Sequence, residues 1–252
     1  MHSSTFIQVA LNGDANHPAA PRRPRDIAEA AMMSTRAGAD SIHVHAFDHN
    51  GKETLNGATC SALLREIRRV CPNTPISLTT SATIVPDPTK RLHVIAGWTE
   101  LPDLVTANQG EEGIVELCEL LLARGVEIEA GLLTISDAHA FVASGLASRC
   151  RRVLIEPLEL DVNMALGNAA TMENILIAAG IELEQVHHGY GPACWAVNRR
   201  ALTRGHGIRT GLEDVAILPD GLPANSNAEL VMAAIEMARS TTCSCDQSRS
   251  SR

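Results

Sequence analysis

The sequence contains few aromatic residues, since only 3 Phe, 2 Trp and 1 Tyr occur among its 252 residues. Acidic side chains outnumber basic ones, which gives a formal net charge of -8. Proteins that bind single-stranded nucleic acid use aromatic stacking surfaces, and proteins that bind duplexes or anionic membranes use a cationic face. We therefore expect neither nucleic acid nor a membrane surface as a partner.

Long apolar runs are also absent. No stretch reaches the roughly 18 uninterrupted apolar residues that indicate a transmembrane helix. The first residues, MHSSTFIQVALNGD, lack the basic start and apolar centre of a signal peptide. The seven cysteines are odd in number and scattered, which is typical of reduced thiols rather than of a disulfide framework. These features predict a cytoplasmic protein.

Short aliphatic runs alternate with amphipathic stretches, and no Ser/Gly linker interrupts the alternation. Eight strand-then-helix units in one domain most simply close into a (β/α)8 barrel, the α/β fold also called a TIM barrel. We expect strands at residues 5–11, 40–45, 75–80, 103–106, 126–130, 152–156, 183–187 and 207–210, and helices at 24–36, 57–70, 89–97, 111–124, 136–144, 171–179, 194–203 and 227–239.

The same pattern sets the expected domain boundaries and one alternative fold. The catalytic barrel is expected at residues 1–240, and the polar segment 241–252, with Cys243 and Cys245, is expected to be a disordered tail. Two thiols alone do not make a zinc site. The alternative fold is a doubly wound sheet, but the turn after the first strand, Asn12-Gly13-Asp14, lacks the G-x-G-x-x-G spacing that this fold usually carries.

Active sites of such barrels lie at the C-terminal ends of the strands, and the second expected strand ends in His43-Val44-His45. Residues two apart on a strand point to the same face, so both imidazoles can converge on one ion. Two histidines and a carboxylate suit Zn²⁺ and leave a coordination position for substrate. A bare H-x-H also occurs where histidines are merely exposed or hydrogen-bonded, but here the apolar neighbours favour a buried strand.

The eighth expected strand ends in a second ionisable group, formed by Arg209, Glu213 and Asp214. One carboxylate could bind the metal while the other acts as a base, and a buried arginine could bind a carboxylate through two hydrogen bonds. The alternative interpretations are acids at the start of a helix and a salt bridge on the surface.

Other strand ends supply further candidates. Asp14 could recognise substrate charge, or form an Asx turn after Gly13. Glu129 could orient a ligand, or be a carboxylate of the barrel interior paired with a basic residue. His187 and His188 could donate protons, with one of them hydrogen-bonded in the barrel wall.

Several of these segments together resemble one family, the β-keto acid cleavage enzymes, whose named member is 3-keto-5-aminohexanoate cleavage enzyme. The resemblance runs from about residue 6 to 239, and its most specific parts are AGA-x-x-x-HxH and GxxRxGLED. The segments that carry it are Ala10-Leu11-Asn12-Gly13, Ala37-Gly38-Ala39, Ile42-His43-Val44-His45, the stretch from Arg68 to Cys71-Pro72, Thr106-Ala107-Asn108, Glu127-Ile128-Glu129 and 207–214.

The resemblance implies a zinc-dependent barrel that condenses a β-keto acid with acetyl-CoA and cleaves the adduct to acetoacetate and a new CoA thioester. The matched zinc ligands are His43, His45 and Glu213, and the matched catalytic pair that handles the proton of the carbon nucleophile is Asp214 with Arg209. Family positions and strand ends give as substrate-binding candidates Asp14, Thr79, Thr80, Thr106, Asn108, Glu129 and His188. Asp14 falls where a carboxylate contacts the tail of an aminated substrate, so we expect a β-keto acid with a cationic tail.

The resemblance also implies a homo-oligomer, namely a tetramer, and it matches no residue to CoA binding. Members commonly have Arg where this chain has Phe47, and P-S-T-G-G where it has Leu78-Thr79-Thr80-Ser81-Ala82. The resemblance therefore supports the zinc ligands more strongly than it supports the identity of the substrate. Two other functions stay open: a zinc-dependent aldolase or hydrolase that does not use CoA, and a non-catalytic homologue that binds a metabolite.

Overall fold

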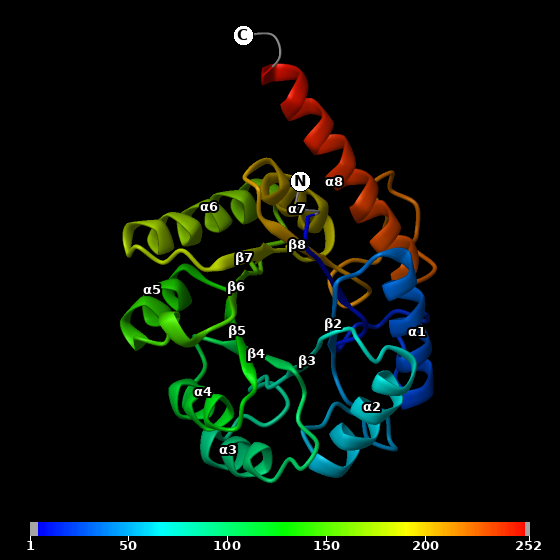
Figure 1. The fold of residues 1–252 in the computed structure, drawn as a ribbon, viewed down its shortest axis with the longest axis vertical. Helices are drawn as coiled ribbons and strands as arrows, with labels where there is room; N and C mark the ends of the chain where they lie inside the picture. The colour runs from blue at the N-terminus through cyan, green and yellow to red at the C-terminus, as the bar shows by residue number, and fades with distance from the viewer. Residues whose placement is uncertain (1–4, 250–252) are drawn as a thin grey trace.

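The computed structural model describes residues 5–249, and their side chains as far as residue 241. The parallel strands form a closed barrel in chain order, and β8 pairs with β1 to complete the ring (Figure 1). This confirms the predicted (β/α)8 barrel. The strands are β1 (Ile7–Ala10), β2 (Ser41–Val44), β3 (Ile76–Thr79), β4 (Leu104–Asn108), β5 (Glu127–Leu132), β6 (Arg152–Ile155), β7 (Glu184–His187) and β8 (Gly207–Thr210).

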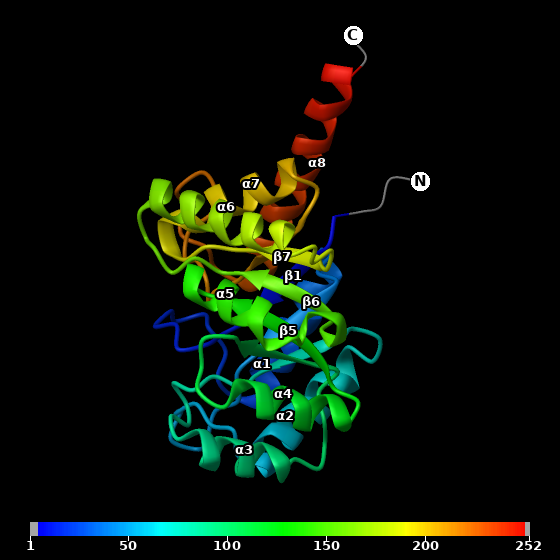
Figure 2. The same cartoon turned by 90° about the vertical axis from the view of Figure 1, so that its left-hand side faces the viewer.

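The helices surround the barrel, and the end of α8 projects beyond it (Figures 1 and 2). Within residues 5–249, no helix has both the length and the apolar character that crossing a bilayer requires. The helices are α1 (Pro24–Ala37), α2 (Gly57–Val70), α3 (Pro88–Ala96), α4 (Ile114–Ala123), α5 (Ile135–Ser144), α6 (Val162–Ala178), α7 (Cys194–Thr203) and α8 (Asn227–Arg249), with two 3₁₀ turns, Ala147–Arg149 and Gly191–Ala193.

Local polar residues set the ends of several helices. The Asn56 side chain accepts hydrogen bonds from two backbone N–H groups at the start of α2. Thr134 and Asp137 form a reciprocal capping box at the start of α5. Gly38 ends α1 with φ of 115°, a conformation that side chains disfavour. These caps satisfy backbone groups that the helix itself leaves unpaired.

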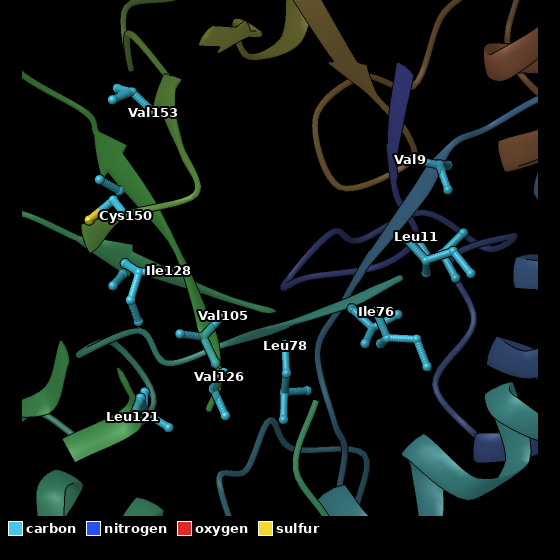
Figure 3. Close-up of a cluster of buried hydrophobic side chains, with 14 of the residues drawn as sticks. Val9, Leu11, Ile76, Leu78, Val105, Leu121, Val126, Ile128, Cys150 and Val153 are labelled. Atoms are coloured by element: carbon cyan, nitrogen blue, oxygen red, sulfur yellow. The ribbon is translucent and has the colours of Figure 1, made fainter. Parts of the chain in front are cut away.

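Along each strand, side chains alternate between the helices outside and the barrel interior. The helix-facing positions are aliphatic and fully buried, and Figure 3 shows some of them: Val9, Ile76, Leu78, Val105, Ile128 and Val153. The interior positions are instead largely polar, and they include Gln8, His43, Ser77, Thr106, Glu129 and Arg209. The hydrophobic core therefore lies between strands and helices, and polar groups line the interior that leads to the mouth.

Two helices differ from the sequence prediction. Helix α6 begins at Val162 rather than at residue 171, because Asp161 caps this start and accepts a bond from the backbone N of Met164 at 2.9 Å. Gly167 interrupts the apolar pattern there, which hid the first turns. Helix α8 continues to Arg249, into the segment that we expected as a disordered tail. Residues 250–252 and the side chains of the two tail cysteines lie outside the described part.

Candidate active site

Two histidines and one glutamate converge at the mouth of the barrel. His43 and His45 come from the end of β2 and Glu213 follows β8, and both of these strands flank β1. The Nε2 atoms of His43 and His45 each lie 3.6 Å from Oε1 of Glu213. One potential ligand atom from each side chain lies within 4.8 Å of the others. We call these three residues the metal-ligand cluster.

The cluster has the properties of a cation site. Oε2 of Glu213 is buried without a hydrogen-bond partner. A Cβ at position 13 would lie 2.6 Å from Cγ of Glu213, so Gly13 provides the space that the glutamate occupies. An unpaired buried carboxylate oxygen is costly unless a cation completes it. Two imidazoles and a carboxylate are a donor set for Zn²⁺ that leaves a position open, so these residues fit a zinc ion.

Both imidazoles have a partner at Nδ1, which leaves Nε2 directed at the cluster. Nδ1 of His43 lies 3.2 Å from the hydroxyl of Thr106, and Nδ1 of His45 lies 2.5 Å from Oε1 of Glu53. Burial lowers the pKa of His43 well below its ordinary value. Burial acts in the same direction on His45, but the carboxylates of Glu213 and Glu53 outweigh it and raise its pKa to about 9.

Next to the cluster lies a buried ion pair between Arg209 and Asp214, rather than the surface salt bridge of our alternative interpretation. Nη2 of Arg209 donates to Oδ1 of Asp214 at 2.8 Å and to Oε1 of Glu213 at 2.6 Å, and its Nε donates to Oδ2 of Asp214 at 3.1 Å. Burial raises the pKa of Asp214 despite the neighbouring guanidinium. The opposite holds for Glu213, because Arg209 and both imidazoles outweigh burial and lower its pKa well below the ordinary value. One guanidinium thus joins a candidate base to a metal ligand.

His187, the last residue of β7, and His188, which follows it, point in opposite directions. His188 lies in the interior, with Nε2 2.8 Å from Oε2 of Glu156 and Nδ1 3.5 Å from Oδ1 of Asp214. His187 lies on the helix side, where it hydrogen-bonds Gln185 at 3.0 Å and stacks on His206. Of the two predicted proton donors, His187 is the one in the barrel wall.

A cavity of about 510 Å³ opens at this mouth. Eight of the predicted site residues line it: Asp14, His43, His45, Thr79, Thr106, Asn108, Arg209 and Glu213. Four others lie behind the lining rather than in it: Thr80, Glu129, His188 and Asp214. The structure therefore brings the predicted ligands, the arginine and most of the predicted substrate residues to one space, with the candidate base directly behind the arginine.

Glu129 and Thr80 occupy places that differ from those expected of substrate-binding residues. Glu129 is fully buried, accepts a bond from Nε2 of Gln8 at 2.8 Å and lies 3.6 Å from Nε of Arg152. It is thus the interior carboxylate of our alternative interpretation, and burial raises its pKa. Thr80 is also fully buried and donates its hydroxyl to the backbone O of Thr106 at 2.7 Å.

Sequence reasoning missed several residues that line the cavity, including Glu53, Glu111 and Asp137. A turn at 48–51 returns the chain so that Phe47 pairs with Glu53, and the Asn-Gly dipeptide in it was the available signal. Glu111 accepts hydrogen bonds from Asn108, from Arg91 and from a backbone N–H of the loop after β3. Its role depends on contacts between distant segments, and no spacing in the sequence indicates it.

The chain is similar to curated proteins along nearly its whole length. It is 23% identical over 264 residues to a 3-keto-5-aminohexanoate cleavage enzyme of Fusobacterium nucleatum, a match that covers 95% of this chain and 93% of the relative. It is 23% identical over 237 residues to the enzyme of the same name from Acetoanaerobium sticklandii, with 89% and 86% covered.

Solved structures show the same fold. A binary complex of ObcA with oxaloacetate superposes with a TM-score of 0.71 at 15% identity, over 87% of this chain and 63% of that chain. A 3-dehydroquinate dehydratase from Aquifex aeolicus has a TM-score of 0.59 at 13% identity, over 93% of this chain and 98% of that chain. This chain thus spans less than two thirds of ObcA. The family model of the beta-keto acid cleavage enzymes matches residues 4–249, and the chain belongs to this family.

Proposed function

We propose that this enzyme is zinc-dependent, and that it condenses a β-keto acid with acetyl-CoA and cleaves the adduct to acetoacetate and a new acyl-CoA. The observation that carries the proposal is the contact between the metal-ligand cluster and the Arg209–Asp214 pair, in which Nη2 of Arg209 lies 2.6 Å from Glu213 and 2.8 Å from Asp214. The names of the curated relatives support the class of substrate.

The residues at the mouth have different roles in the proposed reaction. The cluster would hold Zn²⁺, which when bound supplies a Lewis acid for the keto and carboxylate oxygens of the substrate. The Arg209–Asp214 pair, in which Asp214 lies behind the guanidinium, handles the proton of the carbon between the two carbonyl groups. The guanidinium of Arg209 faces the cavity and stabilises negative charge that develops there. Thr79 also lines the cavity, and its hydroxyl can donate to the substrate carboxylate.

The proposed reaction balances in three steps. The deprotonated carbon attacks the thioester carbonyl of acetyl-CoA, a carbon–carbon bond forms and CoA leaves as the thiolate. The thiolate then attacks the original keto carbon, and the bond between that carbon and the substrate's former nucleophilic carbon breaks. Acetoacetate leaves after its carbon regains the proton, and the remaining acyl group leaves as a CoA thioester. No oxidant or reductant is consumed.

Asp14 bears on which β-keto acid is used. It is exposed at the rim of the cavity, on the loop after β1. We propose that its carboxylate faces a cationic tail of the substrate. Asp14→Asn should then reduce the ratio of kcat/KM between a cationic and a neutral β-keto acid, and an unchanged ratio would contradict this part of the proposal.

The reaction is tested with a panel of β-keto acids, each incubated with and without acetyl-CoA, while acetoacetate is measured by a coupled dehydrogenase. We expect acetoacetate only when both substrates are present. Cleavage without acetyl-CoA would support an aldolase or hydrolase instead. Tight binding of a β-keto acid with no turnover across the panel would support a non-catalytic homologue.

The metal is tested separately by elemental analysis of wild type and of His43→Ala. His139→Ala is the control, because His139 is exposed on α5, away from the cavity. We expect zinc in wild type and in His139→Ala, and its loss in His43→Ala. Zinc-free wild type, or full zinc in His43→Ala, would contradict the proposed site.

A further inference from the structure

A chain of polar side chains leads from the metal ligand His43 into the barrel interior. Nδ1 of His43 lies 3.2 Å from Oγ1 of Thr106 and 3.4 Å from Oγ of Ser77, and these two hydroxyl oxygens lie 3.3 Å apart. Oγ of Ser77 in turn donates to Oε2 of Glu129. All four residues are 7% exposed or less, so bulk water does not compete for these hydrogens.

The far end of the chain is held as an acceptor. Oε1 of Glu129 accepts a hydrogen bond from Nε2 of Gln8 at 2.8 Å, and Nε of Arg152 lies 3.6 Å from the same oxygen. Burial raises the pKa of Glu129, whereas the guanidinium of Arg152 and the hydrogen bonds from Ser77 and Gln8 act in the opposite direction, because each of these contacts needs the acceptor-only form of the carboxylate. The carboxylate therefore takes the single hydroxyl hydrogen of Ser77.

This end point fixes the direction of the remaining hydrogens. Because Ser77 donates to Glu129, its oxygen can only accept from Thr106 and from His43. Thr106 then donates to Ser77, and its own oxygen accepts from Nδ1–H of His43. If Nδ1 of His43 carried no hydrogen, Thr106 would have the only hydrogen available for the three contacts among His43, Thr106 and Ser77. Two of these contacts would then join two acceptor atoms with no hydrogen between them. The arrangement that satisfies every contact protonates Nδ1 and leaves the lone pair on Nε2, which faces Glu213 at 3.6 Å.

We infer that Ser77 and Glu129 are positioning residues for His43, which they hold in the tautomer and orientation that present Nε2 to a metal ion. The inference rests on the metal site of the proposed function, and it gives Glu129 a role different from the substrate contact predicted from sequence. Histidine ligands usually donate their second ring N–H to such a partner. His45 has its own partner in Glu53, at 2.5 Å, so both histidines of the cluster are oriented from behind.

The test is the affinity of the full-length protein for Zn²⁺, measured by competition with a chromophoric chelator. Ser77→Ala leaves all three ligands in place and should raise the Kd about 10–100-fold, the usual effect of losing such a partner. Glu129→Leu removes the terminal acceptor and should act through Ser77. The double variant should then bind Zn²⁺ no more weakly than Ser77→Ala alone.

Two matched controls separate positioning from general damage to the fold. Ser34 is also fully buried and its hydroxyl has no partner, so Ser34→Ala removes a comparable group away from the mouth. Glu173 is a buried carboxylate on α6, and Glu173→Gln controls for loss of a buried charge. Both should keep the wild-type Kd.

An unchanged Kd for Zn²⁺ in Ser77→Ala would overturn the inference. So would a double variant whose affinity for Zn²⁺ falls by the sum of the two single effects. If Glu129→Leu does not fold, the Kd of Ser77→Ala alone is the test.

A second measurement does not depend on metal binding. Long-range ¹H–¹⁵N NMR of the metal-free protein reports which ring nitrogen of His43 carries the proton. We expect Nδ1, and an Nε2-protonated ring would overturn the inference even if zinc binds. Turnover of β-keto acids by wild type tests the proposed function separately. Failure of the proposed function can therefore be distinguished from failure of the positioning role of Ser77 and Glu129.

Discussion

Replacing Gly13 with alanine tests whether the position of Glu213 controls metal binding. Gly13 has φ of +55°, and a Cβ there would lie 2.6 Å from Cγ and 2.9 Å from Cδ of Glu213. Heavy atoms cannot approach this closely, so the glutamate must move out of the cluster. Gly51 provides the matched control, because its φ is +74° and a Cβ there would meet nothing within 4 Å.

Gly13→Ala and Gly51→Ala both place an alanine in a left-handed backbone conformation, but only one of them affects Glu213. The left-handed backbone costs an alanine about 1–2 kcal/mol at either position. Only Gly13→Ala displaces a ligand. Because loss of a mere supporting partner weakens metal binding about 10–100-fold, displacement of a ligand should reach the upper value, about 100-fold. That change corresponds to about 2.8 kcal/mol of binding free energy.

Two assays separate these costs. Urea unfolding of the metal-free proteins should show similar losses of stability in Gly13→Ala and Gly51→Ala. Zinc titration against a competing chelator should show a weaker Kd in Gly13→Ala only. If both variants bind Zn²⁺ with the affinity of wild type, the glutamate either does not move or is not a ligand, and the reasoning is refuted.

Three further variants probe the base and the fold. Asp214→Asn should lower kcat about 100-fold or more, as loss of a general base does, and should keep the zinc content because Asp214 is not a ligand. Asn227→Ala removes hydrogen bonds to Leu11 O and from Leu212 N, at 2.9 and 2.8 Å, and should lower the free energy of unfolding in urea by about 1–3 kcal/mol for each group left unpaired. Burial raises the pKa of Glu173, but hydrogen bonds from one histidine and two arginines outweigh it and lower the pKa to about 2. The stability this adds, at most about 3 kcal/mol, is fully present above pH 4.5 or so and is lost as the pH falls towards 2, so the difference between wild type and Glu173→Gln in pH-dependent unfolding should shrink over that range.

The sequence predicted the barrel because buried parallel strands are short and apolar and each is followed by an amphipathic helix. The strand expected at 40–45, for example, is observed at Ser41–Val44. The first turns of α6 were missed because Gly167 interrupts their apolar pattern, and the capping role of Asp161 is clear only when the helix is seen. The hydrophobic pattern predicts a helix or strand well where burial of one face determines its extent. It predicts the extent less well where a single capping residue sets the first residue of a helix.

The candidate site shows the same division. His43 and His45 were predictable because residues two apart on a strand share a face, and that rule is local. Glu129 obeys the rule as well, but its depth in the barrel depends on how neighbouring strands are staggered. In the observed register it pairs with Thr106 and lies below the mouth, where it supports the cluster from beneath. The side of the sheet on which a side chain lies follows from its place in the strand. Its distance below the mouth depends on how the strands are staggered in the closed barrel, so the sequence could predict only the side.

The charges around Arg209 connect metal binding to the proposed base. Its guanidinium nitrogens lie 2.6 Å from Glu213, 2.8 Å from Asp214 and 4.0 Å from Glu156. One guanidinium cannot balance three buried carboxylates, and although the imidazoles of His45 and His188 also contact them, the group favours further positive charge. A cation held by Glu213 would supply that charge one guanidinium away from Asp214 and favour the ionised form of the base. Removal of zinc should therefore impair proton transfer as well as substrate binding, so that metal and base behave as one electrostatic unit.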